Sequence, residues 1–242
     1  MQPHVPLACY RGRSMPGINA QIAFFAALGV LAALPGPARA VAPRGNPFAN
    51  MQLNGGAALT SKGHLLLVDG LAFASSAYVT TPVTFTATSS FISTFKVTMH
   101  RDHYHPQADG FAFVMQNDPA GDTALGTSGN CIGVCDISNY AAIAFQSYTN
   151  NTAGLWLDGV KTTQFFDTGD QADVVDVTVT YSQVTTTLAF TATNTSTGAT
   201  VSGSYSVDLT TLGPSVYIGF SGGSGASGSV EQVTKWRFKF TD

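Results

Sequence analysis

Turn signals recur along residues 51–240 at intervals of about 8–12 residues, and short segments of β type lie between them. Asp69-Gly70 is one such turn. The segment Asp173–Tyr181 is typical, because apolar residues stand at every second position, as in a strand with one buried face. No stretch shows convincing helical periodicity, and glutamate, a good helix former, occurs once, at Glu231. The pattern predicts an all-β fold, an antiparallel β-sandwich.

Two of these segments, Phe111–Met115 and Ala141–Phe145, are apolar at consecutive positions. A strand that is buried on both faces has this composition, so both are predicted to be central strands. Residues 77–83 are predicted to form a short edge strand instead, since Pro82 has no N–H to donate to a sheet. The chain shows no linker and no internal repeat, so a single β domain is expected.

Polar side chains flank the two central segments. Asp109 precedes the first and Asn150 follows the second, and the loop between the segments is rich in Gly, Ser and Thr. A carboxylate and a carboxamide held close together on a rigid sheet can exchange hydrogen bonds with hydroxyl groups, and a Gly-rich loop can add backbone N–H donors. This arrangement predicts a carbohydrate site, with a glycan or polysaccharide as the partner.

The first forty residues differ from the rest of the chain. Arg11 and Arg13 precede an apolar run of 13 residues, Ile22–Leu34, and the cleavage-type sequence ARA occupies positions 38–40. These features predict a secretory signal peptide at 1–40, a mature domain at 41–242 and a secreted, extracellular or periplasmic location. A membrane anchor is the alternative, but the run is shorter than the roughly 20 residues that span a bilayer. No membrane association is expected after cleavage.

Cysteine usage fits an exported protein. Cys9 lies in the predicted signal peptide, which leaves Cys131 and Cys135 in the mature chain. An even pair in an oxidising compartment usually forms a disulfide, and this one would clamp the loop between the two central segments. Free thiols are the alternative. A metal site would need more ligands than two thiols.

The chain carries little charge, with 10% charged residues and a formal net charge of −3. Its 11 Lys and Arg residues are scattered and form no basic run. Nucleic-acid binding depends on clustered cations that neutralise phosphates. A nucleic-acid partner is therefore not expected.

Several short motifs, taken in order, resemble the L-type (legume-type) lectin domain, and most closely its secreted bacterial branch. The strongest matches are Ala108–Phe113 (ADGFAF) and the sequence YIGFSGG at 217–223, followed by WRF at 236–238. The resemblance covers roughly residues 48–241. It implies a jelly-roll sandwich of the concanavalin A type that binds sugar in a shallow pocket made of loops. It is also compatible with a homodimer.

The resemblance assigns the sugar-binding role to residues from several loops. They are Asp109, Gly129, Tyr148, Asn150, Gly223 and Ser224. Asp109 would be the sugar-binding aspartate, which in the family often follows a cis peptide, here from Ala108. Gly129 would be the loop glycine whose N–H meets a sugar hydroxyl. Gly223 and Ser224 belong to the loop, 223–227, that sets sugar preference in the family.

The same motif departs from the family at its metal ligands. Ala144 stands at the position of the family's glutamate ligand, Gln146 at that of its bridging aspartate, and Thr152 at that of its histidine. Calcium takes about six to eight oxygen ligands, mostly from carboxylates, and Asn150 with a neutral Gln146 is too poor a set. No family-type metal pair and no cofactor are therefore expected.

Three histidines, His100, His103 and His105, lie shortly before Asp109. Their spacing could support a metal site, but the only acidic residue among them is Asp102. A solvated polar loop is the favoured interpretation.

Enzyme activity is not predicted. Glycosidases share the sandwich architecture, and retaining ones place two carboxyl groups about 5–5.5 Å apart. Asp118 and Asp122 have a spacing that suits one strand face, but Pro119 and Gly121 predict a loop there, and Glu231 lies far along the chain. A glycoside hydrolase is therefore disfavoured. The other alternative is a structural or adhesive extracellular β-sandwich that has lost its sugar site.

Overall fold

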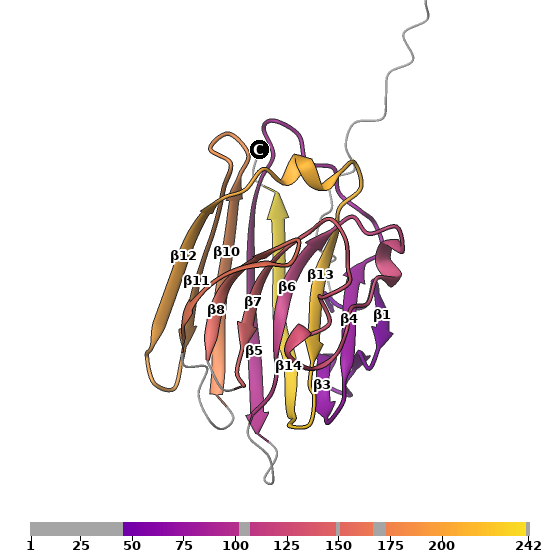
Figure 1. The fold of residues 1–242 in the computed structure, drawn as a ribbon, viewed down its shortest axis with the longest axis vertical. Coiled ribbons are helices and arrows are strands. Elements are labelled where there is room, and N and C mark those ends of the chain that lie inside the picture. The colour runs from indigo at the N-terminus through magenta and orange to yellow at the C-terminus, as the bar shows by residue number, and fades with distance from the viewer. Residues whose placement is uncertain (1–45, 102–106, 149–150, 167–172, 241–242) are drawn as a thin grey trace, which may run out of the picture. The chain divides into compact units, whose positions relative to one another are not determined.

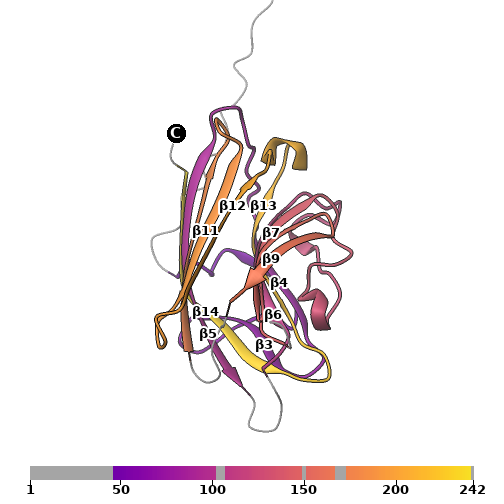
Figure 2. The same cartoon turned by 60° about the vertical axis from the view of Figure 1, so that its left-hand side comes forward.

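The computed structural model describes residues 46–101, 107–148, 151–166 and 173–240. Within these ranges the chain forms two seven-stranded sheets, and Figure 2 shows the two layers from the side. The predicted signal peptide at 1–40 lies outside the described residues, as do Asn150, His103 and His105. No helix in the described ranges is long and apolar enough to cross a membrane.

Most strands of the two sheets are labelled in Figure 1, and β9 is labelled in Figure 2. The first sheet has the order β1 (Met51–Gly55), β4 (Ala74–Val79), β13 (Tyr217–Gly223), β6 (Gly110–Gln116), β7 (Tyr140–Gln146), β8 (Thr152–Leu157) and β9 (Val160–Phe165). The second has the order β12 (Thr200–Ser206), β11 (Thr187–Asn194), β10 (Asp173–Ser182), β5 (Ser90–Arg101), β14 (Ser229–Phe240), β3 (Leu65–Gly70) and β2 (Ala58–Leu59). The short 3-10 helices are η1 (Gly121–Thr123), η2 (Gly129–Cys131) and η3 (Leu209–Leu212).

Neighbouring strands pair antiparallel throughout both described sheets. Strands far apart in the sequence pair in the centre of each sheet, β13 with β6 and β14 with both β3 and β5. The predicted antiparallel jelly-roll sandwich is therefore confirmed. The long-range pairing also brings the ends of β6 and β13 together, which matters for the candidate site.

The two predicted central strands, β6 and β7, are buried on both faces. One face of β6 packs Phe111, Phe113 and Met115 into the core between the sheets. The other face, with Ala112 and Val114, is covered by apolar side chains of the 117–139 connection. Two separate apolar clusters thus account for the apolar residues at consecutive positions.

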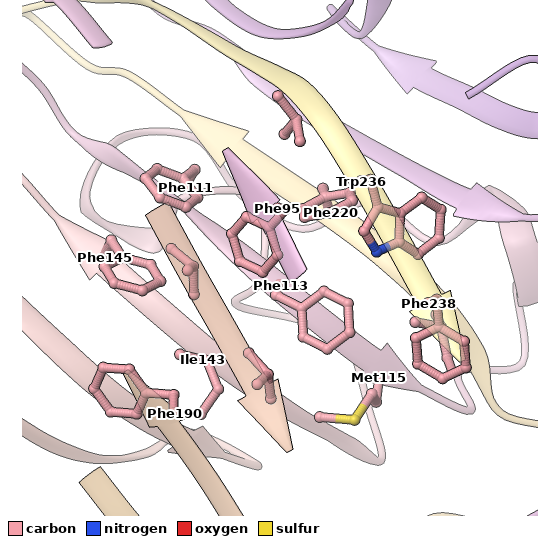
Figure 3. Packing of buried hydrophobic residues seen from close by; sticks show 14 of the residues in the cluster. Phe95, Phe111, Phe113, Met115, Ile143, Phe145, Phe190, Phe220, Trp236 and Phe238 are labelled. Carbon is pink, nitrogen blue, oxygen red and sulfur yellow. The ribbon is translucent and has the colours of Figure 1, made fainter. Parts of the chain in front are cut away.

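Aromatic rings dominate the core between the sheets, as Figure 3 shows. Phe220 of β13 lies edge-on to Phe95, with ring centroids 5.1 Å apart, and to Trp236, at 5.3 Å. Its ring also meets Phe113 at 5.6 Å. Aromatic pairs in edge-to-face contact add to the stabilisation from burial. These rings hold β6 and β13 in place beneath the loops at their ends.

The prediction of an edge strand at 77–83 was wrong. The strand that forms there, β4, ends at Val79 and lies between β1 and β13, so Pro82 falls outside it. At the other side of the first sheet, β9 is the edge strand and all its residues are exposed. The sequence did not predict β9, because a strand exposed on both faces leaves no apolar alternation.

Candidate functional site

Asp109 lies where three strands of the first sheet end together. It directly precedes β6, and its N–H donates to the carbonyl of Gly223, at the end of β13, over 2.9 Å. Its own carbonyl accepts from the N–H of Ser147, just after β7, over 3.0 Å. The Ala108–Asp109 peptide is cis, as the resemblance implied. The backbone of Asp109 is thus fixed by strands on both sides.

The loop that holds Gly129 docks against the segment after β13. The Gly129 N–H donates to the carbonyl of Ser224 over 3.1 Å, so this amide is engaged within the protein. The Ser224 hydroxyl is engaged as well, since it donates to the Gly70 carbonyl over 2.6 Å and accepts from the Phe73 N–H over 3.0 Å. Gly129 and Ser224 therefore join the loops around Asp109.

Two glycines leave space beside the Asp109 carboxylate. A Cβ atom at Gly225 would lie 3.3 Å from Oδ2 of Asp109 and 3.5 Å from Cα of Gly129. A Cβ atom at Gly129 would lie 3.9 Å from the same oxygen, and Gly129 has a φ of +66° that side chains rarely adopt. Any larger residue at Gly225 would occupy the space next to the carboxylate.

Gly225 also supplies a hydrogen bond that sequence reasoning missed. Its backbone N–H donates to the Asp109 carboxylate. Burial raises the pKa of the Asp109 carboxyl, and this hydrogen bond opposes the rise because it favours the charged form. Gly225 lies in the predicted loop at 223–227, but its residue type does not indicate that its backbone N–H would donate to Asp109.

A second carboxyl group lies beneath the site. Glu231 of β14 is fully buried, and its Oε1 lies 2.9 Å from the hydroxyl oxygen of Ser229. The Ser229 hydroxyl is also 2.8 Å from the carbonyl oxygen of Ala108. Burial, with a further contribution from the Asp109 charge, raises the pKa of Glu231 to about 8, and the Ser229 hydrogen bond opposes this. Glu231, distant in the sequence, thus belongs to the surroundings of Asp109.

Tyr148 follows β7 near Ser147 and has 41% of its surface exposed. That exposure is compatible with the predicted contact to a sugar ring. Gln146, at the end of β7, donates from Nε2 to the carbonyl of Asn130 over 2.9 Å and so ties β7 to η2. Asn150 lies outside the described residues, so its predicted role stays a prediction.

The Cys131–Cys135 disulfide predicted from the cysteine pair is present, with 5.2 Å between the two Cα atoms. It spans the end of η2 and the turn after it. The Thr127 N–H donates to the Cys135 carbonyl over 3.1 Å. The bridge thus fixes the loop that presents Gly129.

The side chains at the family's metal positions do not fit the calcium and transition-metal pair. Ala144 has no ligating atom and packs in the apolar cluster beneath the 117–139 connection. Gln146 offers a neutral amide, and its nitrogen donates a hydrogen bond to the carbonyl of Asn130. Among the residues that the structure describes, no group of three or more His, Cys, Asp or Glu side chains could hold a metal ion.

Among the described residues, no exposed pair of carboxylates suits glycoside hydrolysis at Asp109. The carboxyl group that the structure brings near it, Glu231, is fully buried and cannot contact a substrate at the surface. Asp118 is occupied with local hydrogen bonds to Ala120 and Ser138, which lower its pKa against the opposing effect of burial. The described part of the site therefore presents one carboxylate among backbone groups, an arrangement for binding hydroxyl groups.

A family model and several solved structures are similar to this chain over most of its length. The family model described as the legume lectin domain matches residues 44–242. Lectin II from Ulex europaeus has a TM-score of 0.71 and 23% sequence identity, covering 80% of this chain and 94% of that one. Peanut lectin, solved with a nonamer peptide, has a TM-score of 0.68 and 23% identity, covering 83% of this chain and 94% of that one.

One of the similar structures is of a protein described as lectin-like. Arcelin-5, a lectin-like defense protein from Phaseolus vulgaris, has a TM-score of 0.70 and 20% identity, covering 79% of this chain and 92% of that one. No curated protein matches the chain. At such low identities these structures establish a shared fold.

Proposed function

The chain belongs to the legume lectin domain family, and on that premise we propose that it is a carbohydrate-binding protein whose site is built around Asp109. One observation carries the proposal: the backbone of Asp109 is held between β13 and β7, and Gly129 and Gly225 leave space beside its carboxylate. Two relatives of the same fold were solved with sugars, lectin UEA-II with galactose and a Bauhinia forficata lectin with GalNAc. At the level of the family, the protein is not an enzyme.

The proposed chemistry is hydrogen bonding without metal. Asp109 accepts from sugar hydroxyls, and the Gly225 N–H keeps its carboxylate oriented. Asn150 would donate its amide N–H to the same sugar ring, and the exposed ring of Tyr148 would contact the apolar face of the sugar. The contacts are few and the Tyr148 ring is partly exposed, so affinities in the high micromolar to millimolar range are expected.

A glycan array tests the proposal. The purified mature chain should bind at least one class of immobilised galactoside, mannoside, fucoside or N-acetylated hexoside. The Gly225→Val variant should lose that binding, because its side chain fills the space beside Asp109 while the backbone at Gly225 needs no positive φ. If no glycan is bound, the structural or adhesive sandwich becomes the better description.

Calcium should not stabilise this domain, because Ala144 and Gln146 replace the acidic ligands of the family. A ligand present at a hundred times its dissociation constant adds about 2.7 kcal/mol to the native state. In a domain of this size that corresponds to a rise of roughly 5–10 °C in Tm. Melting curves in EDTA and in millimolar calcium or manganese should instead coincide. A rise of several degrees with either ion would place a metal site in this protein.

We also propose that the chain is exported and loses residues 1–40, which rests on the composition of that segment. Intact-mass analysis of secreted protein should give the mass of residues 41–242. A mass that retains the first forty residues would indicate a membrane-anchored form instead. Homodimer formation is a further proposal, which light scattering of the mature chain would test.

A further inference from the structure

A buried chain of polar groups connects β14 to the peptide that leads into Asp109. Ser229 and Glu231 stand two residues apart at the start of β14, and both side chains are fully buried. The Ser229 hydroxyl oxygen lies 2.8 Å from the Ala108 carbonyl oxygen and 2.9 Å from Oε1 of Glu231. The other carboxyl oxygen of Glu231 has no hydrogen-bond partner among the described residues.

The number of available protons decides how these contacts can be made. A serine hydroxyl has one hydrogen, and a carbonyl oxygen can only accept. If Ser229 donates to Ala108, its contact with Glu231 needs a hydrogen from the glutamic acid. An ionised Glu231 would only accept and would compete with Ala108 for the single hydrogen of Ser229. Both contacts are therefore satisfied only when Glu231 is protonated.

The surroundings of Glu231 favour that neutral form. Its register neighbours, Val68 of β3 and Met99 of β5, are buried and apolar. His100 is exposed, and the side chain of Arg101, whose backbone pairs with Ser229, lies outside the described residues. Among the described side chains that are buried, none is Lys, Arg or His. An unpaired charge in such a place is costly, so the group holds its proton.

Asp109 is the other buried carboxyl group among the described residues, and it acts on Glu231 in the same direction. Its negative charge opposes a second negative charge nearby. Together with burial, this raises the pKa of Glu231 to about 8. Glu231 is thus protonated at neutral pH and loses its proton in mildly alkaline solution.

We propose that Glu231 is a positioning residue of the sugar site, which in its protonated form fixes Asp109 through the hydroxyl of Ser229 and the carbonyl of Ala108. When Glu231 loses its proton to solvent, the hydrogen of Ser229 turns to the carboxylate and the Ala108 carbonyl loses its donor. Asp109 is then held less firmly, and sugar affinity falls. The effect on sugar binding rests on the function proposed above, whereas the linkage between Glu231 and Asp109 does not.

The linkage can be measured without any sugar. Glu231 is the only glutamate in the chain, so glutamate labelled with ¹³C at the carboxyl carbon gives a single side-chain resonance. Its titration should have a midpoint near the pKa of about 8. The ¹⁵N resonance of Asp109 belongs to the same peptide as the Ala108 carbonyl and should shift with the same midpoint. Glu231→Gln and Ser229→Ala should both abolish this shift of the Asp109 resonance.

Two results would overturn the proposal: a Glu231 midpoint near its ordinary value of about 4.3, or an Asp109 resonance that is unchanged while Glu231 titrates. Glu231→Gln keeps the shape of the side chain, and its amide can still donate to Ser229. It should therefore fold like the wild type. The Ser229→Ala variant provides an independent break in the same chain of contacts.

The glycan array used for the proposed function supplies the second measurement, at pH 6 and pH 9. Wild-type affinity should fall about five- to tenfold between them, as expected for one lost neutral hydrogen bond. Glu231→Gln should bind equally at both values, and Ser229→Ala should bind weakly at both. Equal wild-type binding at pH 6 and pH 9 would contradict the positioning role. If no glycan binds at either pH, the lectin function fails, while the resonance titration still decides the linkage.

Discussion

Replacing Asp109 by asparagine should lower the affinity for the sugar that the wild type binds by roughly ten- to a hundredfold. A hydrogen bond to a charged group contributes about 1.5–3 kcal/mol, and each 1.4 kcal/mol is about a factor of ten. Asparagine has nearly the same shape and can still accept from the Gly225 N–H, so the loop should keep its structure. Calorimetric titration of both proteins measures the difference.

The comparison with Asn150 makes this prediction more specific. Asn150→Ala removes a neutral donor, so it should cost less affinity than Asp109→Asn. Asp122→Asn is the matched control, since it removes the same charge at η1, which lies beside β1 and β4 and near the far end of β6. If both site variants bind like the wild type while Gly225→Val abolishes binding, the pocket involves the Gly-rich loop without Asp109.

Truncating Phe220 to alanine should lower the free energy of unfolding by roughly 3–5 kcal/mol. The ring is fully buried and contacts Phe95, Phe113 and Trp236, so its loss leaves a cavity between the two sheets. The corresponding fall in Tm is roughly 6–20 °C for a domain of this size. Denaturant unfolding monitored by tryptophan fluorescence and circular dichroism measures the change.

Phe165→Ala is the matched control, because it removes the same ring from the edge strand β9, where 72% of the residue is exposed. A surface substitution of this kind should change the free energy of unfolding by no more than about 0.5 kcal/mol. Similar losses in the two variants would show that Phe220 does not lie in the core described above. Neither substitution touches the hydrogen bonds of Asp109.

The two central strands show how far local sequence can determine a fold. Phe111–Met115 and Ala141–Phe145 are apolar at consecutive positions, and burial on both faces is the reason. The alternation in β10 and β14 likewise identifies strands with one buried face. These patterns arise from each strand's own exposure to water. The sequence alone was therefore enough to predict an all-β sandwich and the strands that end at the candidate site.

Edge position could not be read from the sequence in the same way. Pro82 suggested an edge strand, but β4 ends before it and lies inside the sheet. The strand β9, at one edge of the same sheet, has no apolar face, because its residues are all exposed. Whether a strand is central depends on which partners it finds, and one partner of β4, the strand β13, comes from a distant part of the chain.

The candidate site likewise has a part that the sequence predicted and a part that only the tertiary structure showed. Its candidate residues, above all Asp109 and the glycines of the loop after β13, were predicted from motifs that resemble the family. The donor role of the Gly225 backbone and the contact of Ser229 with the Ala108 carbonyl were not. Glu231 in particular reads in sequence as an isolated acid. Only the pairing of β14 between β3 and β5 buries it beneath Asp109, where burial and a neighbouring charge keep it protonated.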